Sequence, residues 1–85
     1  SRKIKTSKLN DDLLEIISKN PPPSNKGKFV KIKFCNQLPG YYPQFVFYCN
    51  LPKYVKDPYK RFIENKIRNL YDFEGVPITI YFRKK

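Results

Sequence analysis

Histidine is absent from the 85-residue sequence, which removes the side chain that most often acts as general base and as metal ligand. Cysteine is scarce, and Cys35 and Cys49 are too few and too widely spaced for a zinc site. Three glycines occur, and none belongs to a GxxxxGKS or GxxxxGKT phosphate loop. We therefore expect this chain to hold no catalytic site, no metal and no nucleotide cofactor.

Long apolar runs are missing as well. No stretch approaches the roughly 20 residues that a membrane helix needs, and no signal peptide is visible. Two cysteines in a small basic chain indicate reduced, buried thiols and a cytoplasmic protein, with a disulfide as the less common alternative. The sequence starts at Ser1 and not at methionine, which is typical of a domain excised from a longer protein.

Acidic residues are few compared with basic ones. Eighteen Lys and Arg stand against seven Asp and Glu, so the formal net charge is +11 at pH 7. This charge predicts a polyanionic partner or an acidic protein surface. Hydrophobic residues make up 40% and aromatic residues 16% of the chain, too many for a disordered basic tail. The charge therefore belongs to one folded domain.

The N-terminal part predicts a linker followed by a helix. Residues 1–6 are polar and basic and are expected to form the linker, so that the domain itself spans 7–85. Apolar residues recur at helical spacing over 8–19, which predicts an amphipathic helix. Ser7, or alternatively Thr6, is the expected N-cap, and an Asn-Pro-Pro-Pro run ends the helix.

Two strands are expected in the middle of the chain. Over 28–35 apolar and basic residues alternate, which predicts a half-buried strand with Phe34 on one face and Lys31 and Lys33 on the other. Residues 44–50 are nearly all apolar, as in a central strand. The register stays open by one residue, and a slip exchanges the two faces of each strand.

A second helix and a last strand complete the chain. Asp57 is the expected N-cap and Pro58 the first helical residue, whereas Gly75 and Pro77 mark the helix end. The apolar stripe of this helix is expected to contain Tyr59, Phe62, Ile63, Ile67 and Leu70. Alternation over 78–83 then predicts the last strand.

The expected order, α–β–β–α–β, is that of an α+β, two-layer fold. The first two strands are joined by a short loop and should pair antiparallel, and the last two are separated by a helix and should pair parallel. Both helices then cover one face of a three-stranded mixed sheet. The other face stays open and is expected to present Lys31, Lys33, Tyr81 and Arg83.

Seven short segments stand in an order that carries a family resemblance. They are TSKLN at 6–10, PPP at 21–23, GK at 27–28, KIK at 31–33, PQFVFYCN at 43–50, FIENKIRN at 62–69 and FEGVPITIYFRKK at 73–85. Together they resemble the C-terminal KH-like domain of the bacterial double GTPases called Der or EngA, from Thr6 to Lys85. The last segment is the most specific part of this resemblance.

The resemblance implies a type II KH-like variant that acts in maturation of the large (50S) ribosomal subunit. The GTP and magnesium sites of the family lie in preceding GTPase domains, so no cofactor is expected in this chain. The implied partners are the large subunit or its rRNA and the GTPase domains of the same chain, in the cytoplasm and without a membrane. The isolated domain is expected to be a monomer.

One departure concerns the way in which KH domains bind RNA. They clamp four nucleotides with a GxxG loop between two helices. Here Gly27, Gly40 and Gly75 are each followed, three places on, by a residue other than glycine. Residues 51–57 also read as a loop where a KH domain carries its first core helix. The sequence therefore does not support the usual KH grip, and the fold name alone does not assign the function.

Basic residues are the main candidates for contact with RNA phosphates, without base specificity. They are Lys31, Lys33, Lys53, Lys56, Lys60, Arg61, Arg83, Lys84 and Lys85. The ordinary alternative is a charged surface that only keeps the domain soluble. A second hypothesis is a purely intramolecular module that docks on the GTPase domains without binding RNA. Its candidate docking residues are Val46, Tyr48 and Tyr81.

Aromatic and acidic side chains suggest two further hypotheses. Tyrosines offer base stacking, against the alternative that they fill the rim of a small core. The tyrosines concerned are Tyr41, Tyr42, Tyr48, Tyr54 and Tyr81. Acid–base catalysis by Asp57, Asp72 or Glu74 is disfavoured, because a helix cap and a helix-ending turn account for these three carboxylates.

Overall fold

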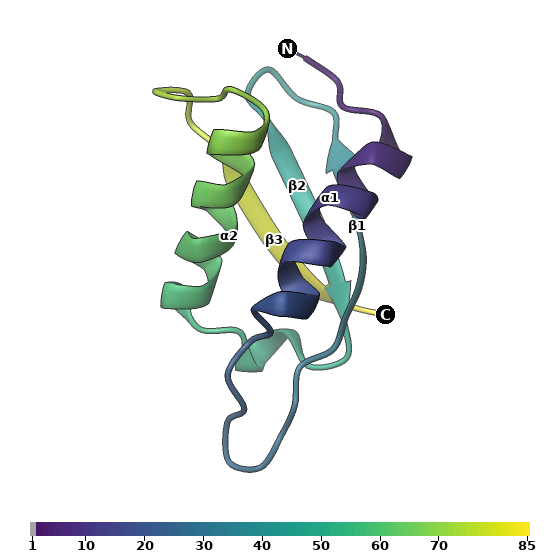
Figure 1. The fold of residues 1–85 in the computed structure, drawn as a ribbon, viewed down its shortest axis with the longest axis vertical. Coiled ribbons are helices and arrows are strands. Elements are labelled where there is room, and N and C mark those ends of the chain that lie inside the picture. Colours follow the sequence, from purple (N-terminus) through teal and green to yellow (C-terminus); the bar gives the residue numbers. More distant parts are fainter. Residues whose placement is uncertain (1) are drawn as a thin grey trace.

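Two helices pack side by side on one face of a three-stranded sheet in a computed structural model that describes residues 2–85 (Figure 1). The elements are α1 (Thr6–Lys19), β1 (Ile32–Leu38), β2 (Gln44–Cys49), α2 (Asp57–Leu70) and β3 (Thr79–Lys84). The order α–β–β–α–β and the α+β fold class predicted from the sequence are confirmed. One turn of 3-10 helix, Pro52–Tyr54, precedes α2.

The central strand of the sheet is β2. It pairs antiparallel with β1 and parallel with β3, as the sequence predicted. Phe45, Phe47 and Cys49 lie on its helix-covered face and have no exposed surface. This result closes the question of register: Val46 and Tyr48 belong to the face that the helices leave open.

The first helix begins earlier than predicted. Thr6 is its first residue, Lys5 occupies the cap position, and no side chain caps the helix, so the prediction of Ser7 or Thr6 as N-cap is wrong. Its end at Lys19, before Asn20 and the proline run, is confirmed. Leu9, Leu13 and Ile17 make its buried stripe. Spacing therefore located the helix well, whereas the choice of cap failed.

Residues 2–5, which precede α1, lie against the sheet. The backbone N–H of Ile4 donates to Oε1 of Gln37 at 2.7 Å, and Nε2 of Gln37 donates to the carbonyl of Arg2 at 2.8 Å. The Arg2 guanidinium donates to the carbonyls of Tyr71 and Asp72 at the far end of α2. Two distant parts of the chain, β1 and the turn after α2, thus hold residues 2–5 in place.

The first strand lies later than the predicted range of 28–35. Asn25 and Lys28 close a tight turn by two backbone hydrogen bonds of 3.0 and 2.9 Å, with Lys26 and Gly27 at positive φ between them. Lys31 then bonds through its N–H to Oδ1 of Asn50 at 2.8 Å and lies before the strand. The alternating pattern therefore began in a turn and not in the sheet.

A β-bulge at Lys33 overturns the predicted faces of β1. Ile32 pairs with Cys49 and Phe34 pairs with Tyr48, so two steps along β1 match one step along β2. Phe34 consequently lies on the open face together with Tyr48, and not on the face of Ile32. Strict alternation placed Phe34 among the helix-facing residues, and this prediction is wrong because the bulge inserts one extra residue.

The second helix has shifted ends. Lys56 occupies the cap position and Asp57 is the first helical residue, so Asp57 is a first-turn acid and not the N-cap. At the other end Asp72 has φ +58°, and the N–H of Phe73 donates to the carbonyl of Arg68 at 3.0 Å. This Schellman-type ending uses Asp72 where Gly75 was predicted. Leu70 falls outside the stripe and is 46% exposed.

Candidate nucleic-acid interface

Three segments distant in the sequence meet at one end of the molecule (Figure 1). They are residues 26–33, 53–61 and 83–85, and we call them the basic end. The topology dictates this meeting: parallel β2 and β3 finish at the same edge, α2 starts near it, and antiparallel β1 begins there. Contacts confirm it, since Lys33 Nζ donates to the carbonyl of Lys85 at 2.7 Å.

Almost all of the net charge belongs to the basic end. Its three segments contain eleven Lys and Arg and one acid, Asp57, so they carry +10 of the chain's +11. The remaining residues contain seven basic and six acidic side chains. Three ion pairs form among the described residues, Lys8–Asp12, Lys19–Glu15 and Arg68–Glu64, and each lies outside the basic end. The charge of this surface is therefore not neutralised from within.

All nine basic residues named from the sequence lie in the basic end. Lys53 and Lys84 line one shallow pocket of about 370 Å³ beside the 3-10 turn. Lys56, Lys60 and Arg61 belong to the start of α2 and the residue before it. Sequence reasoning missed Lys26 and Lys28, whose signal was their position around Gly27 in a turn that points away from the core.

Aromatic rings occupy the part of the open face that adjoins the basic end. The rings of Phe34 and Tyr48 stack with centroids 4.7 Å apart and planes 26° apart. Lys85 Nζ lies 5.1 Å from the Phe34 centroid and 5.7 Å from that of Tyr48. The Arg83 guanidinium lies 5.3 Å from the Tyr81 centroid. Cations and π-faces are thus interleaved on this surface. We call Phe34, Tyr48 and Tyr81, with these cations, the aromatic face.

The candidate docking residues lie together on the same face, but they differ in exposure. Val46 pairs with Asn36 on one side and Tyr81 on the other, and its exposed fraction is 1%. Tyr48 and Tyr81 are half-buried and offer surface to a partner. Docking on a GTPase domain through these residues stays a prediction.

The other exposed aromatic residues are divided between the two ends. Tyr41 and Tyr42 pack edge to face at the tip of the loop between β1 and β2, with centroids 4.9 Å apart, at the end of β1 opposite to the basic end. Phe29 lies within the basic end and is 72% exposed. Sequence reasoning missed Phe29, because a strand was expected there and the residue stands in the connection that precedes β1.

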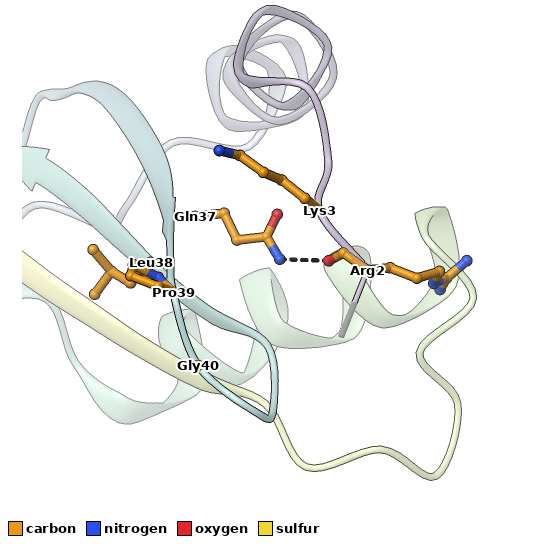
Figure 2. A pocket seen from close by; sticks show the side chains of 6 residues that line it. All are labelled: Arg2, Lys3, Gln37, Leu38, Pro39 and Gly40. Atoms are coloured by element: carbon orange, nitrogen blue, oxygen red, sulfur yellow. Dashed lines mark hydrogen bonds between the residues drawn. The ribbon is translucent and has the colours of Figure 1, made fainter.

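A second pocket lies at the end opposite to the basic end (Figure 2). Its lining residues are Arg2, Lys3, Gln37, Leu38, Pro39 and Gly40. Figure 2 shows the Gln37 amide directed toward the carbonyl of Arg2, the hydrogen bond that holds residues 2–5. The polar groups of Gln37 and Arg2 are thus engaged within the domain.

The titratable groups with shifted pKa values are structural. Burial raises the pKa of the Cys35 thiol to about 12 and also raises that of Cys49, and both are free thiols. A hydrogen bond from Lys8 lowers the pKa of Asp12, which also accepts a 3.0 Å bond from the Tyr71 hydroxyl. A neutral thiol is a poor nucleophile. Among residues 2–85 no three Cys, Asp or Glu side chains gather as potential metal ligands.

A comparison against known families identifies the domain. Residues 3–83 match the family described as KH-domain-like of EngA bacterial GTPase enzymes, C-terminal. The chain belongs to this family. The resemblance seen in the sequence is thereby confirmed.

Relatives of this EngA C-terminal domain are similar along its whole length. It is 67% identical over 85 residues to a GTPase Der of Christiangramia forsetii, covering 100% of this chain and 20% of the relative. It is 66% identical over 84 residues to a GTPase Der of Flavobacterium psychrophilum, covering 99% and 19%. For a GTPase Der of Phocaeicola vulgatus the identity is 56% over 84 residues, covering 98% and 19%. The chain spans about one fifth of these relatives.

The structure of this EngA C-terminal domain differs from the usual RNA-binding KH arrangement. Between β2 and α2 it has one turn of 3-10 helix, Pro52–Tyr54, in place of a core helix. The sequence has no GxxG loop to place there. Among the described residues, no helix has the length and hydropathy needed to cross a membrane. A contact with RNA without the GxxG grip would need other features of the surface, of which the basic end carries the most charge.

Proposed function

We propose that this domain binds ribosomal RNA of the large subunit through the basic end and so contributes to assembly of that subunit. The observation that supports the proposal is the placement of +10 of the +11 charge on one end, outside every ion pair of the described residues. Lysines and arginines that form no ion pair with a side-chain carboxylate suit a phosphate backbone, which presents a dense row of negative charges.

The mechanism is electrostatic positioning. Each Lys or Arg that meets a phosphate releases a condensed counterion, and this release supplies the binding free energy. Nine of the eleven basic side chains are lysines, which bind phosphate as mobile point charges and carry no base information. The contact therefore holds the domain at a site on folded RNA, and the choice of site comes from RNA shape.

In a protein of the length of its relatives, this domain accompanies GTPase domains on the same chain, and those domains would hold GTP and magnesium. The relatives are named GTPase Der, which supports this arrangement. The proposed role of the domain is to bring a GTPase to rRNA. The second candidate, a docking module without RNA contact, is favoured by the half-buried tyrosines of the open face and predicts salt-tolerant binding to protein.

Salt titration of RNA binding tests the proposal. The 85-residue chain is titrated with a fluorescent fragment of large-subunit rRNA at salt concentrations from 50 to about 300 mM. The Lys31→Gln/Lys53→Gln/Lys84→Gln variant removes three exposed charges of the basic end. It should reduce the slope of log K against log salt by about 3, since each phosphate contact contributes roughly 0.9.

The control removes three exposed charges from elsewhere on the surface. Lys3→Gln/Lys5→Gln/Lys66→Gln has the same net charge as the first variant, and its slope should match that of the wild-type chain. An equal loss of affinity in both variants would show attraction to net charge without a site. Absent or salt-independent RNA binding would favour the docking module.

A further inference from the structure

The aromatic face, at the border of the basic end, has no role in a contact made through phosphates alone. Phe34 and Tyr48 are cross-strand partners on β1 and β2, and Tyr81 lies on β3, so the three rings come from all three strands. Both helices lie on the other side of the sheet (Figure 1). The inference that follows rests on the proposed function, because it concerns what a bound RNA does at this face.

The three rings surround a buried side chain of the central strand. Val46 lies between them on β2, is almost fully buried, and does not belong to the cluster packed under the helices. The bulge at Lys33 is what turns Phe34 toward this face. Without the extra residue, Phe34 would point at the helices and Tyr48 would have no stacking partner. The β-bulge at Lys33 thus brings the Phe34 ring beside the Tyr48 ring.

The charges around the rings suit a nucleotide better than a protein side chain. Lys85 Nζ lies over Phe34 and Tyr48, and the Arg83 guanidinium lies over Tyr81. An unpaired nucleotide carries both a π-face and a phosphate, so one group stacks on a ring while the other takes the cation. An acidic peptide would use the cations and leave the rings without a partner.

We propose that the aromatic face stacks one or two unpaired bases of the RNA whose phosphates lie along the basic end. The contact is sequence-tolerant, because every base has a π-face. It selects structure instead: double-stranded RNA keeps its bases stacked inside the helix, whereas a loop, bulge or single-stranded end exposes them. The domain therefore binds RNA where a paired region opens into an unpaired one.

Two RNA probes with the same number of phosphates test this proposal. One is a blunt hairpin, and the other is a shorter hairpin with a single-stranded extension. The wild-type chain should bind the extended probe about tenfold more tightly. The Tyr48→Leu variant should bind both probes equally, at the level of the blunt hairpin. The matched control, Tyr42→Leu, removes an exposed tyrosine at the opposite end and should keep the tenfold preference.

A Tyr48→Trp variant keeps the test decisive if the leucine variant folds poorly. The sequence contains no tryptophan, so this residue is the sole tryptophan and can be excited selectively, apart from the tyrosines. Its fluorescence should be quenched by the extended probe and not by the blunt one. Equal affinity of the wild-type chain for both probes, with a steep salt slope, would overturn the stacking proposal and leave phosphate binding intact. Loss of salt-dependent binding to both probes would overturn the proposed function itself.

Discussion

The two ends of this domain use their positive charge in opposite ways. At the end that holds residues 2–5 and the end of α2, arginines bind the protein itself. Arg68 donates to the carbonyls of Phe73 and Val76 and pairs with Glu64, and Arg2 donates to carbonyls and lies 4.7 Å from the Phe73 ring centroid. At the basic end eleven cations face one carboxylate.

The two ends also differ in the type of basic residue that they carry. Each arginine of the first end donates from one terminal guanidinium nitrogen to two carbonyls, and these bonds fasten the turns that follow α2. The basic end carries nine lysines and two arginines, and lysine keeps its hydration and mobility until an anion displaces the water. One end thus uses charge for stability, and the other holds charge ready for binding.

The largest effect on stability should come from Arg68→Gln. This change removes two charged hydrogen bonds to part-buried carbonyls, at 3.0 and 2.6 Å, and the ion pair with Glu64. Loss of about 2 to 3 kcal/mol in the free energy of unfolding is expected. Urea unfolding measures it. Arg61→Gln at the basic end should cost less than about 0.5 kcal/mol. Equal losses of unfolding free energy in Arg68→Gln and Arg61→Gln would contradict the different roles given to the arginines of the two ends.

A smaller, pH-dependent effect should come from Asp12→Asn. Asp12 accepts from Lys8 at 3.1 Å and from the Tyr71 hydroxyl at 3.0 Å, and its pKa is lowered by the hydrogen bond from Lys8. A carboxyl with a lowered folded-state pKa stabilises the fold above its unfolded pKa and loses that contribution as pH falls through the folded value. The variant should be about 1 kcal/mol less stable at pH 7.

The matched measurement for this carboxylate is a pH series of thermal unfolding. The difference between the wild-type chain and Asp12→Asn should shrink as the pH falls below the ordinary aspartate pKa of about 4, and it should vanish only below the lowered folded-state pKa of Asp12, where both carry a neutral side chain. Asp11→Asn, on the exposed side of α1, should show a difference of less than about 0.5 kcal/mol. A difference for Asp12 that stays constant with pH would mean that the charge of Asp12 is not involved.

The smallest expected effect on the free energy of unfolding is a gain in stability and not a loss. Neutralising cations of the basic end relieves repulsion within the folded state. The Lys31→Gln/Lys53→Gln/Lys84→Gln variant should therefore be as stable as the wild-type chain or more stable by about 0.3 kcal/mol at low salt, and the gain should fade as salt is added. Destabilisation of this variant would show that these lysines hold the fold, in contrast to the role assigned to them.

Much of the fold was predictable, because it depends on periodicity. Helical spacing predicted both helices, and the apolar run predicted β2 as the central strand, whereas the placement of Phe45 and Phe47 under the helices came from the structure because the register had stayed open. The meeting of the basic segments was not predicted, although it follows from the topology, because parallel strands separated by a helix end at one edge. The nine basic residues named from the sequence therefore lie together, although each comes from a distant segment.

The parts that could not be predicted depend on single hydrogen bonds. The bulge at Lys33 leaves no trace in an alternating pattern, so Phe34 was assigned to the wrong face and the aromatic pair with Tyr48 stayed hidden. The cap positions of both helices failed for a similar reason, since several polar residues lie near each start and backbone geometry chooses among them. The Gln37 contacts with residues 2–5 join groups 33 and 35 positions apart.

The position of β3 in the chain has a consequence for how the domain folds. β2 needs two neighbours, and the second of them, β3, comes after α2 and ends at Lys84. During synthesis from the N-terminus, the α1–β1–β2 unit emerges first, with one edge of its most apolar strand unpaired. Closing the sheet requires a contact of long sequence separation, which is slow to form. Nascent chains of this domain therefore pass through a stage with an exposed strand edge, during which protection from aggregation matters most.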